Sequence, residues 1–143
     1  MQYQLGNPDI VVVEDNEDEA LLTTMALAKI LPRPTVLVIP DGEQALIRLQ
    51  GEAGLRPQLL LLDLKLPKVH GLDVLAALKA DPTTSDIAVV ILTSSDHPSD
   101  IERAQALGCN EYLCKPIDWQ KYVELVCNAT VQYLAGSTCS LTS

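Results

Sequence analysis

Acidic residues that could hold a cation, and one aspartate that could act as a nucleophile, follow separate apolar runs of the chain. Four leucines, Leu59–Leu62, lead directly into Asp63, and an earlier apolar run ends in Glu14 and Asp15. Carboxylates that converge on one point repel one another, so a bound cation is favoured. With oxygen ligands only and no paired His or Cys, the expected ion is Mg²⁺. The alternatives are a solvated acidic helix start for Glu14 and Asp15, and a simple turn residue for Asp63.

A threonine and a lysine complete a candidate site for phosphoryl transfer. Thr93 follows the apolar run 88–92, and Lys115 follows the run 111–114. An ammonium group can neutralise one phosphoryl oxygen, and a hydroxyl can donate a hydrogen bond to another. The set favours a phosphoryl acceptor in which Asp63 is the nucleophile while Mg²⁺ and Lys115 absorb charge. A solvent-exposed lysine is the simpler alternative for Lys115.

The elements that would position these side chains alternate between short apolar runs and helical stretches. The expected strands are 10–14, 35–39, 59–62, 88–92 and 111–114, and the expected helices are about 18–31, 42–50, 72–80, 99–107 and 118–135. This alternation predicts an α/β fold: a doubly wound, five-stranded parallel sheet in the order 2-1-3-4-5 with five helices, a flavodoxin-like three-layer sandwich. The carboxyl ends of its strands meet at one edge, which is where the candidate side chains would converge.

Several residues are expected to fix the helix ends. Asp41 and Asp118 stand where N-caps belong, and Ser99 with Glu102 forms a possible capping box. Gly108 is expected to end the fourth helix in a left-handed conformation, and Pro32 to stop the first.

Length and composition limit the classes of protein that the chain can be. The 143 residues fit one domain, 1–135, followed by a small polar tail, 136–143, that we expect to be disordered. The net charge is -9 with no cluster of Lys and Arg, so nucleic-acid binding is not expected. No signal pattern and no apolar run of about 18 residues is visible, which predicts a cytoplasmic protein with no membrane association. The four cysteines form no metal-binding pattern, and we expect reduced thiols, with Cys114 and Cys127 buried.

The order and spacing of these motifs resemble the receiver domain of two-component response regulators (CheY-like). The resemblance is carried by Glu14-Asp15, Asp63-x-x-x-Pro67, Gly71, Thr93-Ser94 and Lys115-Pro116, and it spans roughly residues 8–134. Lys115-Pro116-x-Asp118, Tyr122 and Tyr133 in a single-domain chain are similar to the small regulators that partner bacterial phytochromes. Val69-His70 departs from the pattern, because an acidic residue commonly precedes the glycine in this family.

The resemblance implies a role for each matched residue. Asp63 would accept a phosphoryl group from a sensor histidine kinase, with a phytochrome as one candidate. Mg²⁺ would be held by Glu14, Asp15 and Asp63 together with the backbone carbonyl of Lys65. Lys115 would pair with the phosphoryl group. The peptide bond between Lys115 and Pro116 would be cis. Thr93 and Tyr112 would move together as the switch.

The last helix carries more apolar surface than packing on one side requires. The excess predicts a partner, most simply a second copy of the chain that docks through the fourth helix, fifth strand and fifth helix. The predicted interface residues are Trp119, Tyr122, Leu125, Val126 and Ala129. The alternative is a set of singly exposed apolar residues, which is ordinary on protein surfaces.

Three functions remain open at this point. The leading one is a phosphorylation-controlled interaction protein that catalyses only its own phosphorylation and dephosphorylation, so it is not an enzyme acting on a separate substrate. A phosphorylation-independent adaptor with the same fold is the second, although the complete acidic site argues against it. A flavodoxin-like cofactor binder is the third, but Glu14 and Asp15 stand where a phosphate-binding loop would be needed.

Overall fold

The computed structural model of the chain describes residues 7–140, and a five-stranded parallel sheet forms its centre. The strands are β1 (Ile10–Val13), β3 (Val36–Ile39), β4 (Leu59–Leu62), β5 (Ala88–Thr93) and β6 (Glu111–Cys114). They lie in the order β3-β1-β4-β5-β6, and every neighbouring pair is parallel. Counted without the short strand β2 described below, this is the predicted order 2-1-3-4-5, so the predicted fold is confirmed.

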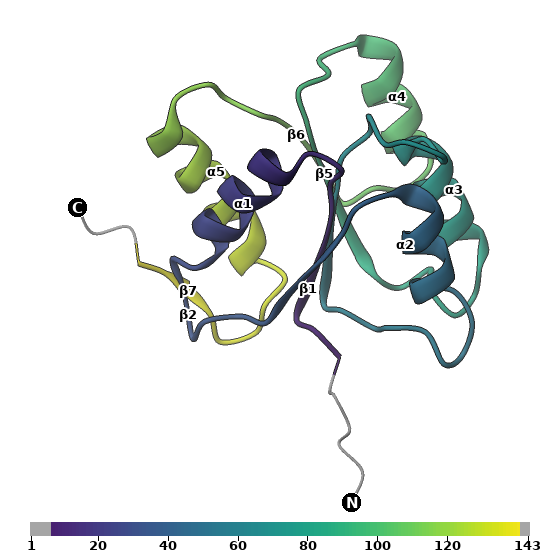
Figure 1. The fold of residues 1–143 in the computed structure, drawn as a ribbon, viewed down its shortest axis with the longest axis horizontal. Helices are drawn as coiled ribbons and strands as arrows, with labels where there is room; N and C mark the ends of the chain where they lie inside the picture. Colours follow the sequence, from purple (N-terminus) through teal and green to yellow (C-terminus); the bar gives the residue numbers. More distant parts are fainter. Residues whose placement is uncertain (1–6, 141–143) are drawn as a thin grey trace, which may run out of the picture.

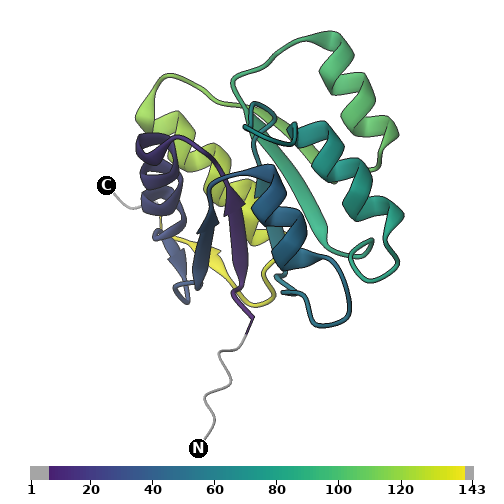
Figure 2. The ribbon, with the colours of Figure 1, turned by 45° about the vertical axis from the view of Figure 1, so that its right-hand side comes forward.

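Helices cover both faces of the sheet, which gives the three layers seen in Figures 1 and 2. One face carries α1 (Glu17–Leu27) and α5 (Trp119–Val131); the other carries α2 (Gly42–Leu49), α3 (Gly71–Ala80) and α4 (Pro98–Ala106). The side chains of β1 alternate between these two layers. Val11 and Val13 belong to the hydrophobic core under α2 and α3, and Ile10 and Val12 to the core under α1 and α5. Burial on both faces explains why the strands read as uninterrupted apolar runs.

The predicted helix caps are partly confirmed. Asp41 Oδ1 accepts from the Gln44 N–H at 2.7 Å, and Asp118 Oδ1 accepts from the Lys121 N–H at 3.1 Å, as expected of N-caps. Gly108 has the predicted left-handed conformation, with φ of 92°. The capping box at Ser99 is wrong, because α4 begins one residue earlier at Pro98, a residue type that suits the first helical position.

The segment after α1 and the C-terminal segment form a second, two-stranded sheet that the sequence did not predict. Helix α1 ends at Leu27 rather than Leu31, and β2 (Ile30–Leu31) pairs antiparallel with β7 (Thr138–Cys139). The expected disorder of the tail is therefore wrong as far as residue 140, while residues 141–143 lie outside the described part of the chain. The physical reason is burial: Ile30 and Leu134 are buried in the core under α1 and α5, and they anchor a segment whose composition alone suggests disorder.

The cysteines also differ from expectation. Cys127, buried in α5 as predicted, forms a disulfide with Cys139 rather than remaining reduced, because the pairing of β7 with β2 brings the two Cα atoms to 5.9 Å. Cys114 is a free thiol, as expected, but it is exposed at the end of β6. None of the helices within residues 7–140 combines the length and apolar character needed to cross a membrane.

Candidate functional site

The buried strand β4 delivers Asp63 to the carboxyl edge of the sheet, where the residue is only 9% exposed. The start of α3 lies directly beside it, since the Gly71 N–H donates to the Leu64 carbonyl at 2.9 Å. A Cβ atom on Gly71 would overlap the Asp63 carbonyl oxygen and the Leu64 Cα. Glycine is therefore required here for the helix to approach the Asp63 backbone so closely.

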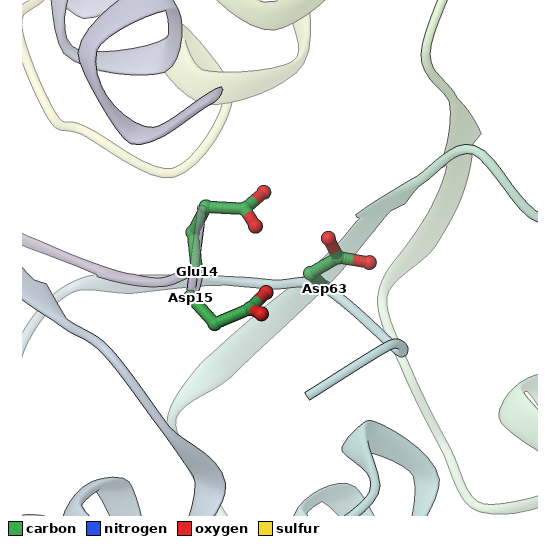
Figure 3. A group of neighbouring side chains, drawn as sticks. All are labelled: Glu14, Asp15 and Asp63. Carbon is green, nitrogen blue, oxygen red and sulfur yellow. The ribbon is translucent and has the colours of Figure 1, made fainter. Parts of the chain in front are cut away.

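Three carboxylates converge at this edge, as predicted. One oxygen each of Glu14, Asp15 and Asp63 lies within 4.8 Å of the others, and Figure 3 shows the side chains grouped at the ends of β1 and β4. Glu14 and Asp63 are buried, whereas Asp15 is exposed. An all-oxygen cluster with one open, solvent-facing member suits Mg²⁺, which binds one or two carboxylates and retains several waters. The residues present therefore fit the ion that the sequence predicts.

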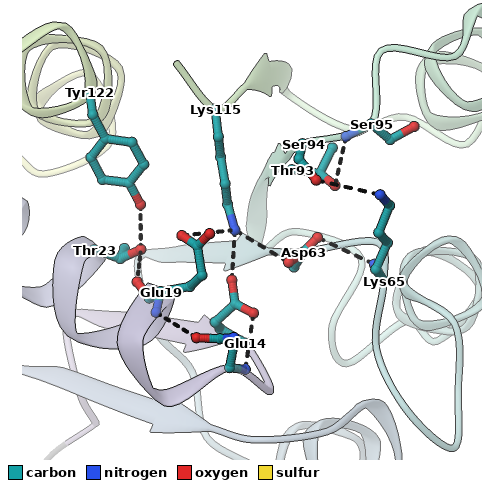
Figure 4. A network of polar contacts seen from close by, with 11 residues as sticks. Glu14, Glu19, Thr23, Asp63, Lys65, Thr93, Ser94, Ser95, Lys115 and Tyr122 are labelled. Atoms are coloured by element: carbon teal, nitrogen blue, oxygen red, sulfur yellow. Dashed lines mark hydrogen bonds and ion pairs between the residues drawn. The ribbon is translucent and has the colours of Figure 1, made fainter. Parts of the chain in front are cut away.

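Lys115 supplies the positive charge of the site. Its ammonium Nζ lies 2.7 Å from Glu14 Oε1, 3.3 Å from Asp63 Oδ2 and 3.8 Å from Glu19 Oε2 (Figure 4). The predicted placement of Lys115 beside Asp63 is confirmed, while Glu19 is a further member of the site that was not predicted. The sequence feature that could have indicated Glu19 is Asn16, a residue type that suits an N-cap. Asn16 Oδ1 accepts from the Glu19 N–H at 2.9 Å, and this bond fixes the first turn of α1.

Burial and charge set the protonation of these groups. Burial, with the nearby charge of Asp63, raises the pKa of Glu14 to about 7, although Lys115 opposes the shift. Burial also raises the pKa of Asp63, but the charge of Lys115 and hydrogen bonding outweigh it, so this pKa lies below its usual value. Burial lowers the pKa of Lys115, but the bond to Glu14 and the surrounding carboxylates more than compensate and raise it. Asp63 is therefore ionised and Lys115 charged, the states that nucleophilic attack on a phosphoryl group requires.

Thr93, the last residue of β5, and Tyr112, on β6, both form hydrogen bonds to the loop between β5 and α4. Thr93 is fully buried, and its Oγ1 accepts from the Ser95 N–H at 3.3 Å. The Tyr112 hydroxyl donates to the Ser95 carbonyl at 2.9 Å from its half-buried position on β6. The structure thus brings the two predicted switch residues to one loop.

The predictions for Lys65 and for Pro116 have different outcomes. The Lys65 N–H donates to Asp63 Oδ1 at 3.2 Å, while its ammonium lies 3.5 Å from Ser94 Oγ across the site. Ligation of a metal by the Lys65 carbonyl stays a prediction. The cis bond between Lys115 and Pro116 is wrong: among residues 7–140, the cis peptide joins Leu31 to Pro32. Trans is the preferred isomer before proline, and only the resemblance suggested otherwise.

The predicted interface on α5 is largely buried inside the chain. Tyr122, Val126 and Ala129 are buried, Leu125 is half-buried, and Trp119 remains 40% exposed. This part of the interface prediction is wrong because α5 packs against α1, the sheet and the C-terminal segment, so neighbours within the chain cover its wide apolar arc.

The sheet order, the carboxylate cluster and the lysine beside Asp63 define a doubly wound α/β protein with an acidic site at the carboxyl edge of its sheet. The model of the response regulator receiver domain matches residues 10–127, so the chain belongs to the receiver domain family of response regulators.

Two proteins of similar sequence are also described as regulators. Rcp1, a response regulator of Synechocystis, is 36% identical over 110 residues, which cover 74% of this chain and 75% of Rcp1. FilR2 of Methanothrix harundinacea, described as a probable methanogenesis regulatory protein, is 37% identical over 114 residues, with 78% of this chain and 74% of FilR2 covered.

Two solved structures are also similar. Phosphorylated RcpA, a cyanobacterial phytochrome response regulator, superposes with a TM-score of 0.83 at 35% identity and covers 94% of this chain and 99% of its own. The Mn²⁺-bound form of Rcp1 superposes with a TM-score of 0.80 at 31% identity, covering 92% and 99%. The chain is thus similar to phytochrome response regulators in both sequence and fold.

Proposed function

We propose that Asp63 accepts a phosphoryl group and that the resulting charge controls interactions of this receiver domain with other proteins. The observation that carries the proposal is the ionised, almost buried carboxylate of Asp63, 3.3 Å from the ammonium of Lys115. A phosphorylated form of the similar protein RcpA supports it.

In the proposed reaction, an Asp63 oxygen attacks the phosphorus of a phosphohistidine, so that an O–P bond forms while the N–P bond breaks and the histidine nitrogen leaves. Lys115 lies between Glu14 and Asp63, within reach of a phosphoryl oxygen on Asp63. Thr93 is the hydroxyl available to a second phosphoryl oxygen. Glu14, Asp15 and Asp63, with the Lys65 carbonyl, would hold Mg²⁺, which when bound supplies further neutralisation of phosphoryl charge. The Mn²⁺-bound form of Rcp1 supports a divalent ion.

The phosphoryl donor in this proposal is a sensor histidine kinase. Similarity to the phytochrome response regulator RcpA favours a phytochrome as that kinase. The chain would catalyse only its own phosphorylation and dephosphorylation.

Docking to other proteins would then be the output. The exposed side chains of Ile117 and Trp119 at the start of α5 support a docking surface there. Self-association through α4, β6 and α5 stays a prediction, with the buried residues of α5 removed from its interface.

Intact mass of the purified protein, incubated with acetyl phosphate and Mg²⁺, tests the proposal. We expect a gain of about 80 Da that requires Mg²⁺ and is absent in Asp63→Asn. Asp86→Asn, which changes an exposed aspartate before β5, is the matched control and should gain the same mass. Sizing of the same samples checks self-association. No gain with any small donor would favour the adaptor, a receiver fold that acts without phosphorylation.

A further inference from the structure

Ser95 receives or makes five hydrogen bonds from a single position in the loop between β5 and α4. Its N–H donates to Thr93 Oγ1 at 3.3 Å, and its hydroxyl donates to Asp100 Oδ2 at 2.7 Å. Its carbonyl accepts from the Tyr112 hydroxyl at 2.9 Å. The two remaining donors are the His97 N–H at 3.4 Å and the Cys114 thiol at 3.5 Å.

These partners come from three different elements of the fold and from the N-cap of one of them. Thr93 ends β5, Tyr112 lies on β6, His97 precedes α4 and Asp100 lies in the first turn of α4. Ser95 is only 9% exposed, so water competes little for its hydrogen bonds. The Ser95 residue is therefore the point at which both predicted switch residues meet the start of a helix.

The hydrogen bond between Ser95 and Asp100 holds the first turn of α4. This helix has no side-chain hydrogen bond at its N-cap, His97, and the Ser95 hydroxyl is instead bonded to a carboxylate of its first turn. A hydrogen bond to a charged acceptor is stronger than one between neutral groups. The Ser95 hydroxyl thus ties the loop to the first turn of α4 through a short, charge-assisted bond.

We propose that Ser95 is a positioning residue that couples the state of Asp63 to α4, through Asp100. The inference rests on the proposed function, since Thr93 would move toward a phosphoryl group on Asp63. The Ser95 N–H is bonded to Thr93 Oγ1, so this movement breaks or drags that bond. The loop then moves. The Tyr112 hydroxyl, bonded to the Ser95 carbonyl, and α4, bonded to the Ser95 hydroxyl through Asp100, move with it.

The test compares the response of α4 to phosphorylation in variants that lose the bond. Backbone amide NMR signals of residues 99–106 report on α4, and intact mass reports phosphorylation of the same sample by acetyl phosphate, so the variants are compared at equal phosphorylation. Ser95→Ala and Asp100→Ala each remove one partner. Ser95→Thr keeps the hydroxyl, and Glu102→Ala is the matched control because it removes an exposed carboxylate from the same helix.

In the wild-type chain, we expect phosphorylation to shift the amide signals of α4. In Ser95→Ala and Asp100→Ala, the shifted population of α4 should fall about fivefold or more, which is the lower end of ordinary allosteric coupling. Ser95→Thr should restore the response and Glu102→Ala should retain it. The Tyr112 signal in 3-fluorotyrosine-labelled protein should still respond to phosphorylation in Ser95→Ala, because the Tyr112 hydroxyl bonds to the backbone carbonyl of Ser95, which this substitution keeps. If the substitution simply unfolded the loop, the Tyr112 response would be lost as well.

An undiminished response of α4 in Ser95→Ala and Asp100→Ala would overturn the coupling, as would an equal loss in Glu102→Ala. Failure of the proposed function is recognised separately, because the wild-type chain would then show no gain of mass.

Discussion

The ammonium group of Lys115 lies 2.7 Å from Glu14 Oε1, and the two side chains are only 9% and 5% exposed. A lysine so nearly excluded from water is held firmly by this bond, because without its carboxyl partners the ammonium would be a costly buried charge. Glu14 therefore fixes the lysine beside Asp63, and it stands in the candidate Mg²⁺ cluster at the same time.

Removal of the Glu14 carboxyl group should weaken metal binding. We expect Glu14→Gln to lower the affinity for Mg²⁺ roughly tenfold, the usual order for loss of a supporting ligand. Isothermal titration calorimetry with MgCl₂ measures this affinity. Glu17→Gln, which changes an exposed glutamate in the first turn of α1, is the control and should bind as the wild-type chain does. Equal binding by Glu14→Gln would exclude Glu14 from the site.

A buried hydrogen bond joins α1 to α5. The hydroxyls of Thr23 and Tyr122 are 2.6 Å apart, and Thr23 already donates to the Glu19 carbonyl, so Tyr122 is the donor. Tyr122→Phe would remove this hydrogen bond, and we expect the free energy of unfolding in urea to fall by about 1–2 kcal/mol. The half-buried Tyr133 offers the control, Tyr133→Phe, which should cost less than about 0.5 kcal/mol. Equal effects of the two substitutions would contradict this role for the bond.

The disulfide between Cys127 and Cys139 should stabilise the fold. It closes a loop with a sequence separation of 12, for which chain entropy predicts about 3 kcal/mol. Dithiothreitol, or Cys139→Ser, should lower the free energy of unfolding by this order, while Cys109→Ser should not. Alkylation without reductant should modify only Cys109 and Cys114. Modification of all four cysteines in the native, unreduced protein would contradict the pairing.

Close packing at Gly71 makes a methyl group there unusually costly. We expect Gly71→Ala to lower the free energy of unfolding by more than about 2 kcal/mol, because its Cβ would overlap the Asp63 and Leu64 backbone. Gly136→Ala is the comparison: it meets open space, and only its positive φ opposes the change, at about 1 kcal/mol. Urea unfolding of both variants checks the order, and a smaller loss in Gly71→Ala would contradict it.

The sequence predicts the central sheet and the site because both depend on local patterns. Apolar runs mark strands buried on both faces, and the parallel connection places Asp63, Thr93 and Lys115 at one edge. The β2 and β7 pairing depends on contacts between residues more than 100 positions apart, such as Ile30 with Cys139, which local periodicity does not encode. The same limit explains α5: its apolar arc is visible in the sequence, but the packing of α1 against it, which covers Tyr122, is not.

The most direct test of the central claim locates the phosphoryl group on the chain. After incubation with acetyl phosphate and Mg²⁺, sodium borohydride reduces an aspartyl phosphate to homoserine, and peptide mass spectrometry identifies its position. We predict homoserine at position 63, dependent on the donor and absent without Mg²⁺. Homoserine at another aspartate, or at none while intact mass shows phosphorylation, would contradict Asp63 as the acceptor.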